Sequence, residues 1–170
     1  MGTANKNTVF LVDDDEIYCK LLKQHLQERF KGTEIKTYGT GEECLQDIHS
    51  KPDLIVLDFY LNSIDESARD GLNVLRQIKA KVPETEVIML TGEENTETAV
   101  SSIKQGAFDY LIKNDNAFIK AENLASKIFF NKKLRDNNNK YRTSLFFVTV
   151  CMAIVTVSTV LIHLQHILSK

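Results

Sequence analysis

The 170-residue sequence predicts an α/β fold: a doubly wound parallel sheet of five strands alternating with five helices, followed by an apolar C-terminal helix. Two observations lead to this prediction. Short apolar runs alternate with segments in which apolar residues recur every three or four positions. Most of these runs lack alternating polar residues, as is typical of strands in a parallel sheet covered by helices on both faces.

Five strands are expected where apolar and β-branched residues cluster between turn-forming residues. Pro52, Pro83 and Gly106 interrupt the chain shortly before the third, fourth and fifth of these clusters. The strands are expected at residues 8–12, 34–38, 54–57, 86–90 and 108–112.

Five helices are expected where apolar residues return at helical spacing. In the first helix these residues are Ile17, Leu21, Leu22 and Leu26, and Asp15 is expected to cap its N-terminus. The helices are expected at residues 16–30, 41–49, 72–80, 96–105 and 117–134.

Polar side chains with complementary chemistry follow the predicted strands. Asp13 and Asp14 follow the first strand, Asp58 the third, Thr91 the fourth and Lys113 the fifth. Because parallel strands deliver their carboxyl ends to one edge of the sheet, these residues are expected to meet in space. Two carboxylates about 4 Å apart repel by roughly 4 kcal/mol at an effective dielectric constant near 20, so three of them call for a cation. Mg²⁺ prefers such oxygen ligands, and the whole set suits phosphoryl chemistry.

This order of residues resembles the receiver domain of response regulators, over roughly residues 8–130. The resemblance implies a flavodoxin-like (βα)5 sheet with strand order 2-1-3-4-5. It implies that residues 1–136 form the receiver domain of a two-component phosphorelay. The phosphodonor would then be a histidine kinase or a phosphotransfer protein.

The resemblance also implies a role for each residue of the acidic edge. Asp58 would be the phosphoacceptor. Asp13 and Asp14 would bind Mg²⁺ together with Asp58 and the backbone carbonyl of Tyr60. Lys113 would pair with the phosphoryl group once it is attached.

The remaining implied roles concern switching and the lifetime of the phosphoryl group. Thr91 would be the switch hydroxyl, and Tyr110 would be the aromatic residue that rotates in response. Tyr60 and Glu93 would tune the lifetime of the phosphorylated state.

Two features depart from the family pattern. The segment 59–70 is longer than usual, and we expect it to cover part of the site or to dock a partner. Asn62 and Asn114 stand where the family usually has prolines, and the second replacement bears on the pose of Lys113.

The C-terminal part of the chain differs from the rest in charge and hydropathy. Residues 1–126 carry 14 basic and 22 acidic side chains, whereas residues 127–170 carry seven basic and one acidic. Within 145–164, 15 of 20 residues are apolar, enough to cross a bilayer core of about 30 Å as a helix. We expect a basic, polar hinge at 137–143 and a transmembrane helix at 144–168. The alternative is a buried or dimerising helix of a soluble assembly.

Charge also indicates location and partners. Basic residues precede the apolar segment, so the receiver domain is expected in the cytoplasm, anchored to the inner (plasma) membrane. The acidic body argues against binding to nucleic acid, and a second copy of the chain is a further expected partner. The three cysteines lack metal-ligand or redox spacing, which favours idle thiols in a reducing compartment.

The predicted function is a membrane-tethered response regulator without a DNA-binding output domain. Its only expected reactions are phosphorylation and dephosphorylation of its own aspartate, so we do not classify it as an enzyme. One alternative is a phosphohydrolase of the haloacid-dehalogenase type with Asp13 as nucleophile. The other is a receiver that acts as a scaffold without being phosphorylated.

Overall fold

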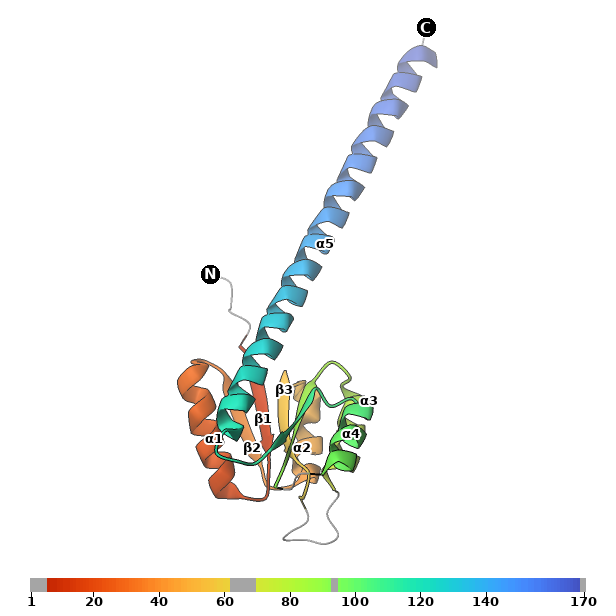
Figure 1. Ribbon diagram of the computed structural model, residues 1–170. Coiled ribbons are helices and arrows are strands. Elements are labelled where there is room, and N and C mark those ends of the chain that lie inside the picture. The colour runs from red at the N-terminus through yellow and green to blue at the C-terminus, as the bar shows by residue number, and fades with distance from the viewer. Residues whose placement is uncertain (1–5, 62–69, 93–94, 169–170) are drawn as a thin grey trace. The chain divides into compact units, whose positions relative to one another are not determined.

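The computed structural model describes residues 6–61, 70–92 and 95–168, and for residues 160–167 it describes the backbone alone. A five-stranded sheet has the order β2-β1-β3-β4-β5, and every strand pair in it is parallel (Figure 1). The predicted fold class and strand order are therefore confirmed. The strands are β1 Thr8–Val12, β2 Glu34–Tyr38, β3 Leu54–Asp58, β4 Glu86–Thr91 and β5 Asp109–Ile112.

The helices alternate with these strands as predicted, and all but the last have bounds close to those expected. A short 3₁₀ turn, η1, follows the second helix. The helices are α1 Glu16–Arg29, α2 Gly41–Asp47, η1 Ile48–Ser50, α3 Gly71–Lys81, α4 Thr96–Lys104 and α5 Ala117–Leu168. By its internal contacts the chain divides into two units, Met1–Phe129 and Phe130–Lys170.

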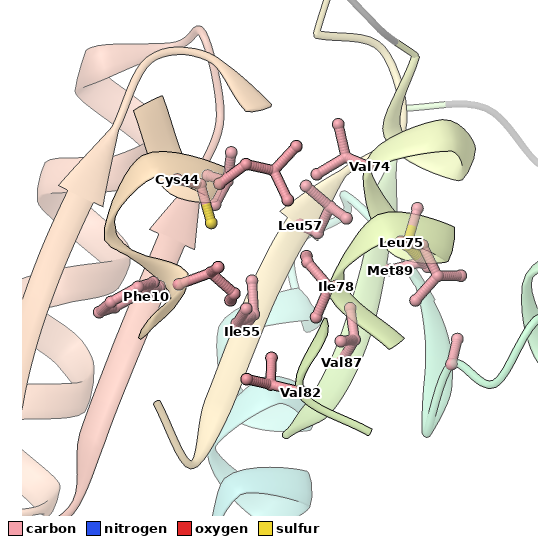
Figure 2. Close-up of a cluster of buried hydrophobic side chains, with 14 of the residues drawn as sticks. Phe10, Cys44, Ile55, Leu57, Val74, Leu75, Ile78, Val82, Val87 and Met89 are labelled. Carbon is pink, nitrogen blue, oxygen red and sulfur yellow. The ribbon is translucent and has the colours of Figure 1, made fainter. Parts of the chain in front are cut away.

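Each strand sends alternate side chains to opposite faces of the sheet, which creates two apolar cores. In β1, Phe10 and Val12 belong to one core, and Val9 and Leu11 belong to the other. The first core is closed by side chains of α2 and α3 (Figure 2). The second is closed by α1 and by the first turns of α5. Full burial of one such aliphatic side chain contributes about 1.5–3 kcal/mol, so both faces hold the sheet in place.

The buried face of α1 includes two of the four apolar residues that predicted this helix. Cys19, Leu22 and Leu26 face the sheet, whereas Ile17 is 72% exposed and Leu21 is 51% exposed. The helix carries two adjacent apolar stripes, and only the stripe that meets the strands is buried. Ile17 and Leu21 fit the helical spacing that predicted α1, but they lie outside its packed face.

The last helix is longer than predicted. We expected it to end at residue 134, before a hinge at 137–143, but α5 continues through these residues to Leu168. Asparagine is a weak helix former, at a cost of roughly 0.7 kcal/mol per residue relative to alanine. Residues 117–168 contain neither glycine nor proline, so nothing in this stretch imposes a break.

Short polar side chains begin four of the helices directly after the strand ends or loops. Asp15, Thr40, Asp70 and Asn95 each accept a hydrogen bond from a backbone N–H in the first turn of α1, α2, α3 and α4. Such a cap typically contributes about 1 kcal/mol and fixes where the helix starts. The predicted capping role of Asp15 is confirmed.

Gly71 allows α3 to begin close to the end of β3. A Cβ atom at this position would collide with the carbonyl oxygen of Asp58 and lie 2.8 Å from the Cα atom of Phe59. The Gly71 N–H donates a hydrogen bond to the carbonyl of Phe59 at 2.9 Å. The helix is thus fixed against the backbone that carries Asp58.

Replacing Gly71 by alanine is expected to destabilise the fold by about 1–3 kcal/mol, because the methyl group must displace the backbone at the end of β3. The measurement is urea unfolding of the Gly71→Ala variant. Gly39→Ala is the matched control, since a Cβ there meets no atom within 4 Å. Equal stability of the two variants would contradict this account of the packing.

Candidate functional site

Three carboxylates converge at the carboxyl-terminal edge of the sheet. Asp13 directly follows β1, Asp14 comes next, and Asp58 is the last residue of β3. One carboxylate oxygen from each lies within 4.8 Å of the others. Asp13 and Asp58 are only 4% and 3% exposed. The structure therefore brings together side chains that are 44 or more positions apart in sequence, as in a divalent-cation site.

Lys113 connects two of these carboxylates. Its Nζ atom lies 2.7 Å from Asp13 Oδ2 and 3.2 Å from Asp58 Oδ1. Its backbone N–H donates to the carbonyl of Thr91 at 2.7 Å, which extends the pairing of β4 with β5 by one residue. Asn114, which replaces the usual proline of the family, has not prevented the ammonium group from reaching the acidic side chains.

Among the buried carboxylate oxygens of the cluster that the structure describes, Asp14 Oδ2 is the one that neither accepts a hydrogen bond nor contacts Lys113. Asp13 Oδ1 accepts the N–H of Asp15 at 3.0 Å, and its other oxygen contacts Lys113. Asp14 Oδ2 is buried, and within the described residues it accepts no hydrogen bond. An unsatisfied buried carboxylate oxygen is costly unless a cation or water completes its contacts.

The site is electrostatically strained. Burial, together with the charge of Asp13, raises the pKa of Asp58 to about 6, although Lys113 opposes the shift. Burial also raises the pKa of Asp13, again against the effect of Lys113. Burial alone would lower the pKa of Lys113, but its contacts with Asp13 and Asp58 raise it above the usual range. A further positive charge at this edge would relieve the carboxylates.

Three of the other predicted site residues lie within the described part of the chain. Thr91 is the buried last residue of β4, and Tyr110 is a partly buried residue of β5 beside the first core. Tyr60 is 40% exposed, and its ring meets that of Phe59 edge to face at 4.8 Å. Glu93 and most of the long segment after Tyr60 lie outside the described residues.

Two residues of α1 contact the site but were not predicted from the sequence. The Nζ atom of Lys113 lies 4.8 Å from the ring centroid of Tyr18, a cation–π distance. The Cys19 thiol donates a weak hydrogen bond to the carbonyl of Asp13 at 3.8 Å. Their only signal in the sequence is their place one helical turn after the aspartate pair. The position alone does not reveal which neighbours they meet.

Comparison with known proteins identifies the family of this domain. The sequence model of the response regulator receiver domain matches residues 9–126. The chain belongs to the response regulator receiver family. This receiver domain is 36% identical over 110 residues to the nitrogen assimilation regulatory protein NtrX of Azorhizobium caulinodans, covering 64% of the chain and 23% of that protein. The chain thus matches about a quarter of the length of this relative.

Solved receiver structures agree with this assignment. The signal receiver domain of a putative LuxO repressor protein from Vibrio parahaemolyticus has a TM-score of 0.67 at 31% identity, covering 77% of this chain and 95% of that one. A response regulator from Burkholderia pseudomallei was solved with a phosphorylated aspartic acid, a calcium ion and citrate. Its TM-score is 0.61 at 25% identity, and 76% of this chain and 75% of that chain are covered.

The raised pKa of Asp58 predicts a pH-dependent gain in stability for the metal-free Asp58→Asn variant. An unfolded aspartate has a pKa of about 3.9. Below pH 4, Asp58 is therefore protonated in the folded state without cost, and the wild type has its full free energy of unfolding. The wild type loses part of this stability between about pH 4 and pH 6, because Asp58 keeps its proton in the folded state and releases it in the unfolded state. At pH 7 the variant should gain up to about 3 kcal/mol, and at pH 4 almost nothing.

The measurement is urea unfolding in EDTA between pH 4 and pH 7.5. Asp115→Asn, at an exposed position before α5, controls for the loss of one carboxylate. Parallel pH profiles for wild type and Asp58→Asn would contradict the electrostatic account of the site.

Proposed function

We propose that this receiver domain accepts a phosphoryl group on Asp58 in a Mg²⁺-dependent reaction and acts at a membrane. The observation that carries the first half is the cluster of three carboxylates bridged by the Lys113 ammonium. The phosphodonor in this proposal is a histidine kinase or a phosphotransfer protein, as for response regulators in general.

The donor set fits Mg²⁺. Asp13, Asp14 and Asp58 offer only oxygen ligands, and the unpartnered Oδ2 of Asp14 is available for one more contact. The backbone carbonyl of Tyr60 completes the protein ligands in this proposal. Mg²⁺, when bound, neutralises charge on the carboxylates and on the oxygens of the transferred group. The phosphorylated aspartic acid and calcium ion in the Burkholderia relative support this choice of site.

The chemical step is an exchange of one bond to phosphorus for another. A carboxylate oxygen of Asp58 forms a bond to phosphorus while the bond from phosphorus to the donor's imidazole nitrogen breaks, and that bond's electron pair stays on the nitrogen. Lys113 lies 3.2 Å from Asp58, so its ammonium group is placed to pair with a phosphoryl oxygen. Asp13 keeps the lysine at this edge through the 2.7 Å contact.

Phosphorylation changes the charge next to the switch residues. The new group adds three strong acceptors, and the hydroxyl of Thr91 donates to one of them in this proposal. Inward movement of Thr91 leaves space for Tyr110, which lies on the neighbouring strand. Tyr60 and Glu93 tune the lifetime of the phosphoryl group through the access of water to Asp58. The output is then a change in the protein surface near β4 and β5.

The second half of the proposal is a membrane tether formed by residues 144–168, after a receiver domain at 1–136 and a basic segment at 137–143. Of the described helices, α5 is the one that is long and apolar enough to span a bilayer. Within α5, no residue of the most apolar 18-residue stretch is buried. Thr149 and Thr156 donate their hydroxyls to helix carbonyls at 2.8 Å, which satisfies them in an apolar environment. The basic residues before the segment favour a cytoplasmic receiver domain at the inner (plasma) membrane.

Asp58→Asn should abolish phosphorylation, because the amide cannot act as the nucleophile. The assay is incorporation of labelled phosphate from a phosphorylated histidine kinase or from acetyl phosphate, with and without Mg²⁺. Lys113→Ala should reduce the rate at least about tenfold, the loss expected when a charge-stabilising group is removed. Labelling that survives Asp58→Asn but is lost in Asp13→Asn would instead identify a hydrolase of the haloacid-dehalogenase type. A chain that never incorporates phosphate would be a scaffold.

Deleting residues 144–170 should release the chain from membranes. The full chain is expected to resist extraction of the membrane fraction by alkaline carbonate, whereas the shortened chain is expected in the soluble fraction. Phosphate incorporation by the shortened chain provides the control for folding. Recovery of the full chain in the soluble fraction would remove the tether from the proposal and leave the phosphorylation site untouched.

A further inference from the structure

Large apolar side chains in the polar part of α5 lie on one side of the helix. Between residues 130 and 143 they are Phe130, Leu134 and Tyr141, with exposed fractions of 61%, 52% and 75%. They are spaced by four and then seven positions, so they form one stripe along an α-helix. The other residues between 130 and 143 are polar or charged.

The stripe belongs to a longer heptad pattern. In the nomenclature of coiled coils, its a positions are seven residues apart and apolar: Leu134, Tyr141, Val148 and Val155. The d positions are also seven residues apart, and after Phe130 they are small or polar: Asn137, Ser144, Cys151 and Ser158. These positions run over four heptads and form one continuous seam along the helix, with large residues at a and small or polar residues at d after Phe130.

We propose that residues 130–158 pair in parallel and in register with the same residues of a second copy of this chain. The proposal deepens the membrane tether and rests on it for the residues from 144 onward. β-Branched residues at a favour two-stranded pairing, and Val148 and Val155 are of this type. Small residues at d let two helix backbones approach closely inside a bilayer, where packing rather than water exclusion drives association.

The hydroxyl groups on the two sides of the membrane segment behave differently. Thr149, Thr156 and Thr159 each donate to a carbonyl of their own helix at 2.8 Å. Ser144 and Ser158, at d positions, make no hydrogen bond within the part of the chain that the structure describes. A serine facing the same serine of a second copy obtains a partner across the interface. Asn137 is also at a d position and meets its counterpart in this arrangement, where the two side-chain amides hydrogen-bond to each other.

Charge decides between parallel and antiparallel pairing. Lys133 and Lys140 occupy g positions beside the stripe, and the e positions that face them in a parallel pair are Asn138 and Leu145. No two lysines then oppose each other. In an antiparallel pair over the same residues, g positions face g positions, and Lys133 and Lys140 lie beside Ile154 and Phe147 of the membrane segment, where a charged side chain is costly. Copies inserted in the same membrane from the same side also lie parallel at equal depth, which favours a second copy as the occupant.

Cys151 provides a probe at the proposed interface. It is exposed and occupies a d position, whereas Cys19 and Cys44 are buried in the receiver domain. In isolated membranes, molecular iodine takes two electrons from two facing thiols, which lose two protons and form one disulfide. The full chain is expected to give a disulfide-linked species of twice its mass on a non-reducing gel. Cys151→Ser should remove this species.

Two relocated cysteines distinguish the proposed face from random collision. In the Cys151→Ser background, Ser158→Cys restores a thiol at a d position and should crosslink as well as wild type. Ala153→Cys places it at an f position on the opposite side and should crosslink at least about fivefold less. Equal crosslinking at both positions, or none at any position in chains that remain in the membrane fraction, would overturn the proposed pairing.

The polar part of the stripe has its own test. Leu134→Ser combined with Tyr141→Ser should lower the Cys151 crosslink about fivefold, because two of the apolar a positions are lost. Asn139→Ser, at an f position, should leave it unchanged. Membrane fractionation of each variant reports the tether separately. A chain that fails to insert but still crosslinks at Cys151 contradicts the tether and supports the pairing.

Discussion

The mutual repulsion of three closely spaced carboxylates, two of them buried, is opposed by one ammonium group and is the constraint on which this molecule depends. Asp58 ends a strand that is buried throughout, and Asp13 directly follows one that is buried except for Thr8, so neither can turn to solvent without disturbing the sheet. Lys113 meets both of them. At Gly71, α3 begins against the backbone of Asp58, which fixes this edge of the sheet. The contact of Tyr18 with Lys113 does the same for the lysine. The pocket therefore remains attractive to a cation and to a phosphoryl group because the fold prevents its charges from separating.

The strands and the acidic edge were predictable because the physical signal is strong. A strand covered on both faces must be apolar throughout, and the first polar residue after it marks the edge of the sheet, as Asp13 and Asp58 do. The face of α1 was harder to predict. Its two apolar stripes have the same periodicity, and the contacts with the strands alone decide that Leu22 is buried while Leu21 is exposed.

Other features depend on contacts that a single sequence does not express. The place of Tyr18 next to the ammonium of Lys113 follows from how α1 packs beside the first turn of α5, where the Tyr18 ring meets that of Phe118. The length of α5 was underestimated because three consecutive asparagines suggested a break, although none of them forbids helical geometry. The heptad pattern in this helix was present in the sequence. The proposal of a partner helix rests in addition on the exposure of Leu134 and Tyr141 along a continuous helix, which the sequence alone does not show.

The two ends of the long segment after Asp58 are firmly held. Leu61 is buried in the first core, and Asp70 caps α3 directly before Gly71. The distance that the intervening chain must bridge is therefore set by the domain and not by the segment itself. Doubling the length of a flexible connection between fixed ends costs only about 0.6 kcal/mol in closure entropy. Insertions can accordingly accumulate at this point and acquire new roles, while the geometry of the neighbouring aspartate is left intact.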